Sequence, residues 1–396
     1  MNMNEQMKES EESILHTYNR FPVVFEKGQG CYLYDSEGKE YLDFAAGIAV
    51  NSLGYHYPGY DEALKDQIDK LMHISNLYYN EPIIEAGAKL VKASKMSKAF
   101  FTNSGTEAIE GALKAAKKYA YVRDGHADHE IIAMNHSFHG RSIGALSVTG
   151  TAHYREPFEP LMGGVKFADF NNLESVKAQI TDKTCAIITE VVQGEGGIYP
   201  AKKEFLEGLR QICDEKDIML IFDEIQCGMG RTGHYFAWQA YGVQPDIMTS
   251  AKALGCGVPV GAFVLNEKAA KASLEPGDHG TTYGGNPFVC AAVSKVFDIY
   301  KNDKIIEHVQ EMTPYLEQKL DEIVAKHECA ATRRGMGFMQ GIVIQGRPVG
   351  EVVKAALAKG LLVISAGSDV LRIVPPLVIT KEHIDKMVAI LDECME

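Results

Sequence analysis

The sequence predicts an α/β fold with a mainly parallel sheet covered by helices, followed by a smaller α+β domain. Three observations support this prediction. Short apolar runs alternate with helical patterns through the middle of the chain, which is typical of a parallel sheet with helices on both faces. The runs are continuous rather than alternating, as expected of strands buried on both faces. The chain has 396 residues, well above the ~100–150 residues of one typical domain.

The N-terminal residues are predicted to form an arm and a hairpin. We expect the first 20 residues to be a mobile or helical arm. Tyrosines at positions 32, 34 and 41 flank a turn at Ser36-Glu37-Gly38, a pattern that indicates a β-hairpin. We assign residues 1–55 to this arm and hairpin, and we expect them to pack with the small domain.

The middle of the chain, residues 56–300, is predicted to be the large domain. A helix is expected from about residue 60, and helical patterns separate most of the strands that follow. The candidate strands are Ala99–Thr102, Ile131–Met134, Val165–Phe167, Cys185–Thr189, Met219–Phe222, Ile247–Thr249 and Gly261–Leu265.

The remaining residues, 301–396, are predicted to form the small domain. One long helical stretch, from residue 288 to about residue 327, should lead away from the sheet. The tail then mixes short strands with helices, which indicates an α+β arrangement. The expected strands are Phe338–Val343 and Leu371–Val374, and the expected helices are Val352–Lys359 and Lys381–Cys394.

Composition excludes several classes of protein. The formal net charge of −13 argues against nucleic acid or an anionic membrane as a partner. No apolar run approaches the roughly 18–20 residues of a membrane span, and the polar, acidic N-terminus is unlike a targeting peptide. The eight cysteines are scattered without a Cys-x-x-Cys pair, which favours a reducing, cytoplasmic location.

One carboxylate and one lysine are predicted to face the same crevice. The apolar run that ends at Phe222 is followed at once by Asp223, and the run that ends at Thr249 leads into Lys252. Open α/β sheets bind ligands at the carboxyl ends of their parallel strands. A lysine that bonds to an aldehyde, with an acid that keeps a pyridine nitrogen protonated, is what pyridoxal phosphate (PLP) chemistry requires.

A possible phosphate site follows the first candidate strand of the large domain, Ala99–Thr102. Ser104-Gly105-Thr106-Glu107 has the spacing of a capping box, followed by the apolar stripe of a helix. A small turn at a helix N-terminus offers free N–H groups to a phosphate. An ordinary capped helix would have the same pattern, so both interpretations stay open.

The segment Asn135–Arg141 follows another strand. Phe138 is placed to lie on a flat cofactor ring, and Arg141 offers a fork for a substrate carboxylate; the alternative is a core aromatic and a surface arginine. His136 and His139 lack a third ligand, so no metal site is predicted here. The run from Asp124 to His129 also has metal-ligand residue types, but a solvated turn is the preferred interpretation.

Three further segments are rich in glycine. Glu190–Gly197 follows a strand and predicts a tight polar loop, in which Glu195 is a candidate partner for Arg372. Gly228–Gly233 matches the dinucleotide pattern but does not open a helix directly after a strand, so nicotinamide binding is rejected. Gly280–Pro287 could supply a phosphate ligand or be a structural turn.

Taken together, these motifs resemble those of the class III PLP-dependent aminotransferases of fold type I. The similarity runs from about Tyr18 to the C-terminus, and its strength comes from the motifs' order along one chain. They are Ser104-Gly105-Thr106-Glu107, Phe138-His139-Gly140-Arg141, Glu190 to Gly197, Asp223-Glu224-Ile225-Gln226 with the glycine-rich segment after it, Lys252, and Thr281 to Pro287.

The resemblance implies a role for each matching residue. Lys252 would bond to the cofactor, Asp223 would pair with its ring nitrogen and Gln226 would reach its ring hydroxyl. The other implied contacts are phosphate binding by Gly105 and Thr106, ring stacking by Phe138, binding of the substrate α-carboxylate by Arg141, substrate contact by Thr281, and a contribution of Thr282 to the phosphate site of a partner subunit. That last role implies a homodimer with shared active sites.

Within the class, the segment Phe44–Gly54 and the chain length are most similar to the acetylornithine aminotransferases. The implied reaction moves the δ-amino group of N2-acetylornithine to 2-oxoglutarate. Ile48 stands where ornithine aminotransferases carry tyrosine, whereas Tyr18 matches a substrate-contacting tyrosine of that ornithine branch. A Glu195–Arg372 pair that opens only for glutamate would let one site accept substrates with one or two carboxylates.

Other functions fit parts of the same pattern. Succinylornithine, ornithine and 4-aminobutyrate transaminases belong to the same class, and an aminomutase or racemase on this scaffold would need no oxo acid. A non-catalytic α/β protein that has kept the fold would remain colourless with added PLP.

Overall fold

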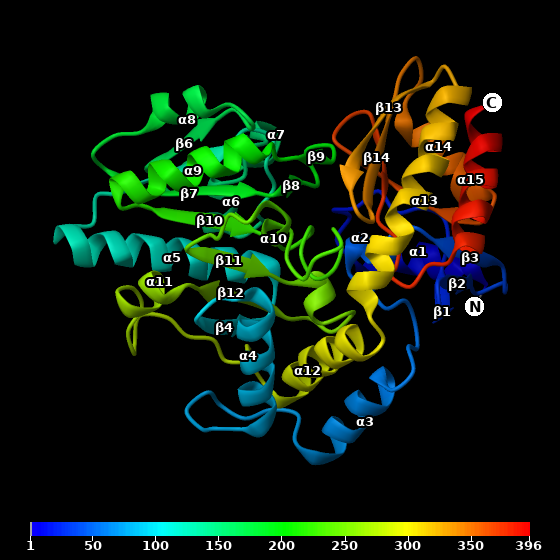
Figure 1. Cartoon of the computed structure of the whole chain (residues 1–396). Helices are drawn as coiled ribbons and strands as arrows, with labels where there is room; N and C mark the ends of the chain where they lie inside the picture. The colour runs from blue at the N-terminus through cyan, green and yellow to red at the C-terminus, as the bar shows by residue number, and fades with distance from the viewer. Residues whose placement is uncertain (1) are drawn as a thin grey trace.

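The computed structural model describes residues 2–396 and places all seven predicted strands of the large domain in one sheet (Figure 1). Only β12 runs antiparallel to its neighbours, so the prediction of a mainly parallel sheet is confirmed. In spatial order the strands are β4 (Lys98–Thr102), β12 (Gly261–Leu265), β11 (Ile247–Ser250), β10 (Met219–Asp223), β7 (Thr184–Glu190), β5 (Glu130–Met134) and β6 (Val165–Ala168).

Helices and two short strands surround this sheet. They are α3 (Tyr60–Lys70), α4 (Glu81–Ser94), α5 (Gly105–Asp124), α6 (Ile143–Ser147), α7 (Ala152–Arg155), the 3-10 turn η1 (Glu156–Phe158), α8 (Leu173–Gln179), β8 (Val192–Gln193), β9 (Tyr199–Pro200), α9 (Lys203–Lys216), α10 (Trp238–Tyr241), the 3-10 turn η2 (Lys252–Leu254), α11 (Glu267–Lys271) and α12 (Pro287–Asn302).

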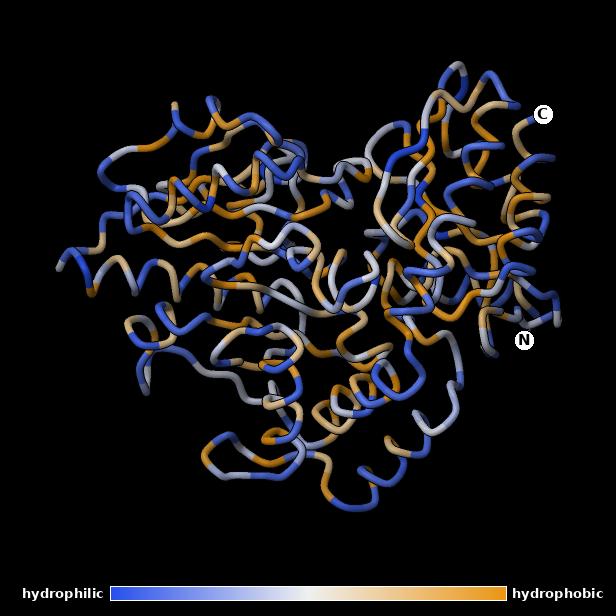
Figure 2. Tube along the Cα trace, in the orientation of Figure 1, coloured by the Kyte–Doolittle hydropathy of each residue, from blue (hydrophilic) through white to orange (hydrophobic). Residues whose placement is uncertain are grey.

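Two hydrophobic clusters lie on the two faces of the large sheet. Along β10, Leu220 belongs to one cluster and its neighbour Ile221 to the other. Helix α9 adds Leu206 to the first cluster, and α5 adds Ile109 to the second. Because successive side chains of a strand point to opposite faces, each residue of a strand covered on both sides must be apolar. Figure 2 shows this hydrophobic character along the central strands.

A second region lies beside the large sheet (Figure 1). It contains an antiparallel sheet with the order β13-β14-β17-β16, together with three helices. The elements are α13 (Ile305–Lys326), β13 (Ala330–Met336), β14 (Met339–Ile344), α14 (Val349–Ala358), β16 (Ile364–Ala366), β17 (Val370–Ile373) and α15 (Lys381–Met395).

The N-terminal hairpin joins this second region. Its strand β3 pairs in parallel with β15, a short strand that follows α14. The elements are α1 (Met3–Ser13), β1 (Phe25–Gln29), β2 (Tyr32–Asp35), β3 (Glu40–Asp43), α2 (Ala46–Ala49) and β15 (Leu361–Leu362). The division of the chain at residues 55 and 300 stays a prediction.

One helix expected from the sequence is divided in the structure. The stretch 288–327 forms α12 and α13, with a break at Asp303 and Lys304. Lys304 has a φ of 54°, a left-handed conformation that ends a right-handed helix. Within residues 2–396, none of the helices combines the length and the apolar character that crossing a membrane requires.

Candidate active site

A cavity of about 500 Å³ lies where β10, β11, β5 and β7 end. Seven of the residues predicted from the sequence line it, although they come from four separate segments of the chain. They are Gly105, Thr106, Phe138, Arg141, Asp223, Gln226 and Lys252.

Lys252 reaches the cavity from the turn that follows β11. It begins η2 with a φ of 50°, an uncommon conformation for a residue with a side chain. Burial lowers the pKa of the Lys252 amine to about 8, because a low-dielectric environment disfavours the charged form. An amine with a lowered pKa is more available as a base and as a nucleophile.

Asp223, the last residue of β10, is held in one orientation by three hydrogen bonds. Its Oδ2 lies 2.7 Å from Nδ1 of His139. Its Oδ1 accepts bonds from the Thr249 hydroxyl at 3.1 Å and from the Ile225 amide at 3.0 Å. The side chain is buried, so this carboxylate is fixed before any ligand arrives.

A second carboxyl group, Glu190, lies beside Asp223 at the end of the neighbouring strand. Burial and the negative charge of Asp223 raise the pKa of Glu190 well above its ordinary value. Glu190 accepts hydrogen bonds from the backbone amides of Phe138, at 3.3 Å, and Gly194, at 3.1 Å. It therefore connects two of the loops that form the cavity.

The N-terminus of α5 borders the cavity at Gly105 and Thr106. The Ser104 side chain accepts a bond from the Glu107 amide at 3.3 Å, as the capping box predicts. The reciprocal bond differs, because Glu107 accepts from the Asn103 amide at 2.7 Å rather than from Ser104. A Cβ at Gly105 would come within 2.9 Å of Ile225, so glycine keeps this helix end open to a ligand.

Arg141 presents its guanidinium at the cavity wall. The guanidinium carbon lies 4.1 Å from the ring centroid of Tyr154 and 5.4 Å from that of Phe138. None of the carboxylates in residues 2–396 forms a salt bridge with Arg141. Its fork is thus positioned by aromatic rings and left free for an anionic ligand.

Glu195 and Arg372 form the ion pair that the sequence analysis predicts. Arg372 Nη1 lies 2.5 Å from Glu195 Oε1, and Nη2 lies 3.3 Å from Oε2. Arg372 also donates to Gln226 Oε1 at 3.1 Å. Burial opposes ionisation of Glu195, but the charge and hydrogen bonds of Arg372 outweigh it and lower the pKa of this carboxyl. The pair connects the turn between β8 and β9 to β17 of the second region.

Five of the predicted residues are not among those that line this cavity. Two of them, Glu195 and Arg372, form the ion pair described above, and the other three are Thr281, Thr282 and Tyr18. Thr281 is half-buried and accepts a bond from the Asn103 side chain at 3.3 Å, whereas Thr282 is exposed. Tyr18 is also exposed. The residues that follow Tyr18 line a separate cavity of about 1070 Å³, to which Ile48 and Arg372 contribute. A single chain thus leaves Thr281, Thr282 and Tyr18 apart from Lys252.

The sequence alone predicts no individual role for His139 or Glu190. Both belong to motifs of the family resemblance, but His139 otherwise indicates only a possible metal ligand and Glu190 only a polar, glycine-rich loop. Their contacts join loops that are distant along the chain, and the residue types alone do not specify such contacts. The adjacency of His139 to Phe138, in a loop already placed at the site, was the one available signal.

The segment Gly228–Gly233 forms turns instead of a helix N-terminus. The Arg231 side chain is buried and donates to the carbonyls of Phe338, at 3.4 Å, and Pro375. This arginine therefore ties the glycine-rich segment to the second region of the fold.

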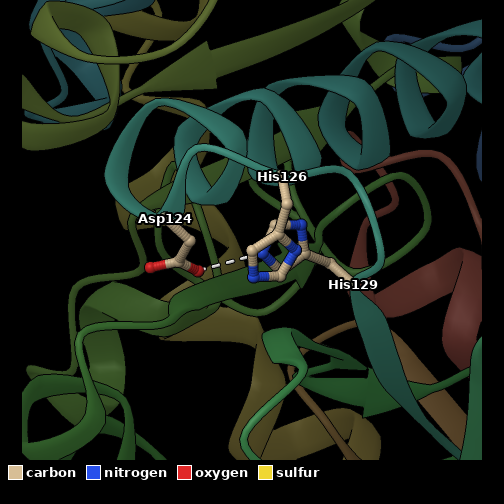
Figure 3. Close-up of side chains that lie close together, drawn as sticks. All are labelled: Asp124, His126 and His129. Atoms are coloured by element: carbon tan, nitrogen blue, oxygen red, sulfur yellow. Dashed lines mark hydrogen bonds and ion pairs between the residues drawn. The ribbon is translucent and has the colours of Figure 1, made fainter.

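Asp124, His126 and His129 form a cluster at the end of α5 (Figure 3). The prediction of a solvated turn is wrong for His129, which is buried with Nε2 at 2.9 Å from Asp124 Oδ2. Arg123 donates to both carboxylate oxygens at 2.6 Å and holds the pKa of Asp124 well below its ordinary value. A cation would have to displace this guanidinium, so we assign no metal-binding role to the cluster.

Comparison with known proteins places these features in one family. The profile of the family described as Aminotransferase class-III matches residues 14–395. An acetylornithine aminotransferase from Clostridium acetobutylicum is 47% identical, over 98% of this chain and 100% of that protein. Another, from Methanocaldococcus jannaschii, is 48% identical over 96% of this chain and 95% of that protein.

Solved structures agree with this assignment. The ornithine aminotransferase from Toxoplasma gondii, described with partial occupancy of PLP at its active site, superposes with a TM-score of 0.95. It shares 28% sequence identity, and the match covers 100% of this chain and 94% of that chain.

Proposed function

Because the chain belongs to the class III aminotransferases, which depend on PLP, we propose that it transfers the δ-amino group of N2-acetylornithine to 2-oxoglutarate. The products are N-acetylglutamate 5-semialdehyde and glutamate, which makes this a step of arginine biosynthesis. The observation that carries the choice of substrate is the near-complete match to relatives named acetylornithine aminotransferase, at 47% and 48% identity. The apolar side chain of Ile48 also supports it, since it offers no hydrogen bond to the second amine of free ornithine.

The chemical groups that line the cavity fit those of PLP. Lys252 offers an amine with a lowered pKa, Asp223 a fixed carboxylate, and the N-terminus of α5 free N–H groups beside Thr106. Phe138 would cover one face of the ring and Gln226 would meet its hydroxyl. When bound, PLP supplies an electron-accepting ring and an aldehyde that reacts with amines.

The proton transfers fall to two side chains in this proposal. Lys252, whose pKa is about 8, would carry a proton away from the substrate carbon that bears the reacting amine. Asp223 would hold a proton on the ring nitrogen through charge pairing, which keeps the ring able to accept electrons. The orientation of the Asp223 carboxylate depends on His139 and Thr249, which each form a hydrogen bond with one of its oxygens.

Substrate selection would depend on two arginines. Arg141 would bind the α-carboxylate of acetylornithine, which is distant from the reacting δ-amine. Glutamate and 2-oxoglutarate bring a second carboxylate, for which Arg372 would be released from Glu195. With acetylornithine bound, the Glu195–Arg372 pair stays closed and Arg372 does not remain an unpaired buried charge.

We also propose that the enzyme works as a homodimer with shared sites. Exposed apolar side chains occur in two segments, 71–79 and the one that contains Thr282. The Asn76 side chain, which donates to the Gly284 carbonyl at 2.8 Å, joins the two segments. An exposed apolar patch of this kind marks a protein interface. Its members are Leu71, Met72, Leu77, Tyr78, Tyr79 and Tyr283.

In such a dimer, the exposed Thr282 would complete the phosphate site of the partner subunit. Light scattering at micromolar concentration should give twice the chain mass, and a monomer with full activity would contradict the proposal. We also propose a cytoplasmic location, because all eight cysteines are free thiols.

A half-reaction screen tests the choice of substrate. The PLP-loaded enzyme is mixed separately with acetylornithine, succinylornithine, ornithine and 4-aminobutyrate, and the visible absorbance of the cofactor is followed. We expect acetylornithine to bleach it fastest and 2-oxoglutarate to restore it. Faster bleaching by another amine would reject acetylornithine as the substrate. Product formation that does not depend on 2-oxoglutarate would instead indicate an aminomutase.

A further inference from the structure

The turn that carries Glu195 is attached to the second region at two points besides the Glu195–Arg372 pair. The Gly367 amide donates to the Glu195 carbonyl at 2.8 Å. Arg334 Nε donates to the Gly197 carbonyl at 2.7 Å. Residues of the antiparallel sheet region therefore hold the backbone of the turn, residues 194–198, at Glu195 itself and two residues after it.

The same arginine also holds the strand that follows the turn. The guanidinium carbon of Arg334 lies 3.6 Å from the ring centroid of Tyr199, the first residue of β9. This is the closest approach of a cation to a ring centroid in residues 2–396. Stacking and the hydrogen bond to Gly197 together fix the planar group in two directions.

The start of the turn belongs to the large sheet instead. The Gly194 amide donates to Glu190 Oε1 at 3.1 Å, and Gln193 donates through its side chain to the Asn135 carbonyl at 2.9 Å. Glu195 thus lies where the backbone changes from one region to the other. A carboxylate at such a point depends on both sets of contacts for its position.

Glycine at position 197 makes the arginine contact possible. Gly197 has a φ of 115°, and a Cβ there would come within 2.9 Å of Arg334 Nη2. A side chain at this position would therefore push the guanidinium off the turn. Gly197 therefore meets two requirements: it leaves space for the Arg334 guanidinium, and it adopts a positive φ that other residues rarely adopt. Both are expected of a loop that is held in a single conformation.

We propose that Arg334 is a positioning residue that sets substrate preference, by holding the Glu195 turn so that Glu195 stays paired with Arg372. The proposal rests on the proposed function, because preference here means acetylornithine against glutamate. With the backbone held, only the Glu195 side chain has to rotate when a second carboxylate claims Arg372. With the backbone released, Glu195 leaves Arg372 more often, and the site favours substrates with two carboxylates.

The neighbouring residue, Arg333, provides a matched control. It lies on the same strand, but it points to α13, where it pairs with Asp321 at 2.7 Å and with Glu317 at 3.3 Å. Its third partner is Gln340, and within residues 2–396 it forms no hydrogen bond or ion pair with the turn. Replacement of Arg333 by alanine therefore removes a cation and its side-chain contacts from the same sheet, but it leaves the contacts of the Glu195 turn unchanged.

The test compares PLP-loaded wild type with Arg334→Ala, Arg334→Lys and Arg333→Ala. The ratio of kcat/KM for acetylornithine to that for glutamate is measured for each. We expect the ratio to fall about tenfold in Arg334→Ala, since one charge-assisted hydrogen bond is lost. Arg334→Lys should remain impaired because an ammonium lacks the planar fork, and Arg333→Ala should keep the wild-type ratio.

Hydrogen exchange of residues 191–200 gives a readout that is independent of turnover. It should accelerate in Arg334→Ala and stay at the wild-type rate in Arg333→Ala. An unchanged ratio in Arg334→Ala, or an equal change in both alanine variants, would overturn the proposal. If wild type does not use acetylornithine, the proposed function fails, and exchange alone then decides whether Arg334 holds the turn.

Discussion

His139 Nδ1 lies 2.7 Å from Oδ2 of Asp223, and both side chains are buried. The two residues are separated by 84 positions, yet the ends of β5 and β10 bring them together. The other ring nitrogen of His139 has no hydrogen-bond partner among the described residues. The geometry makes this histidine a support for the carboxylate.

Replacement of His139 by alanine should therefore impair catalysis without removing the cofactor site. Loss of one hydrogen bond to a buried carboxylate should lower kcat roughly tenfold and weaken PLP binding by a similar factor. Steady-state kinetics and cofactor titration measure both effects. His126→Ala, a change at an exposed histidine outside the cavity, is the control and should behave as wild type.

Replacement of Asp223 by alanine should have the larger effect. It removes the only group proposed to keep a proton on the ring nitrogen, so PLP should bind loosely and react poorly. We expect a loss of more than about 100-fold in kcat/KM, beyond the effect of one hydrogen bond. Cofactor retention after gel filtration and single-turnover rates are the measurements. Wild-type activity in this variant would refute the electron-sink role of the pair.

Lys252→Ala should abolish turnover and the visible absorbance of the bound cofactor. The native amine can also be tested in the cofactor-free protein. Because burial lowers the pKa of Lys252 to about 8, the amine is protonated below that pH and neutral above it. Labelling by an amine-specific reagent should rise through about pH 8 at Lys252, whereas ordinary lysines respond near ~10.4. Peptide mass mapping of samples labelled at different pH values distinguishes Lys252 from the ordinary lysines.

Glu195→Gln should change substrate preference and stability together. The substitution leaves the buried guanidinium of Arg372 without its carboxylate, which should cost about 3 kcal/mol of unfolding free energy. It also frees Arg372 for a second carboxylate, so the preference should move from acetylornithine toward glutamate. Denaturant unfolding and paired kinetics are the measurements. A variant with unchanged preference between the two amino donors would contradict the proposed switch.

The strands of the large sheet, and the polar residues at their ends, were determined by the sequence alone. Strands buried on both faces must be apolar at successive positions, so central strands such as β5, β7 and β10 are visible as largely continuous apolar runs. Asp223 follows one apolar run directly and Lys252 lies a few residues after another, which is why their common cavity could be expected before the fold was known. Local chemistry was sufficient here because each signal lies within a few residues.

Only the tertiary structure decided which distant segments meet. The contact of His139 with Asp223 depends on the order of strands in the sheet, and the hold of Arg334 on the Glu195 turn depends on how the second region packs beside it. The same holds for β3 and β15, which pair although more than 300 positions separate Leu42 from Leu361. Such contacts are set by the packing of whole elements, and short stretches of sequence carry no record of it.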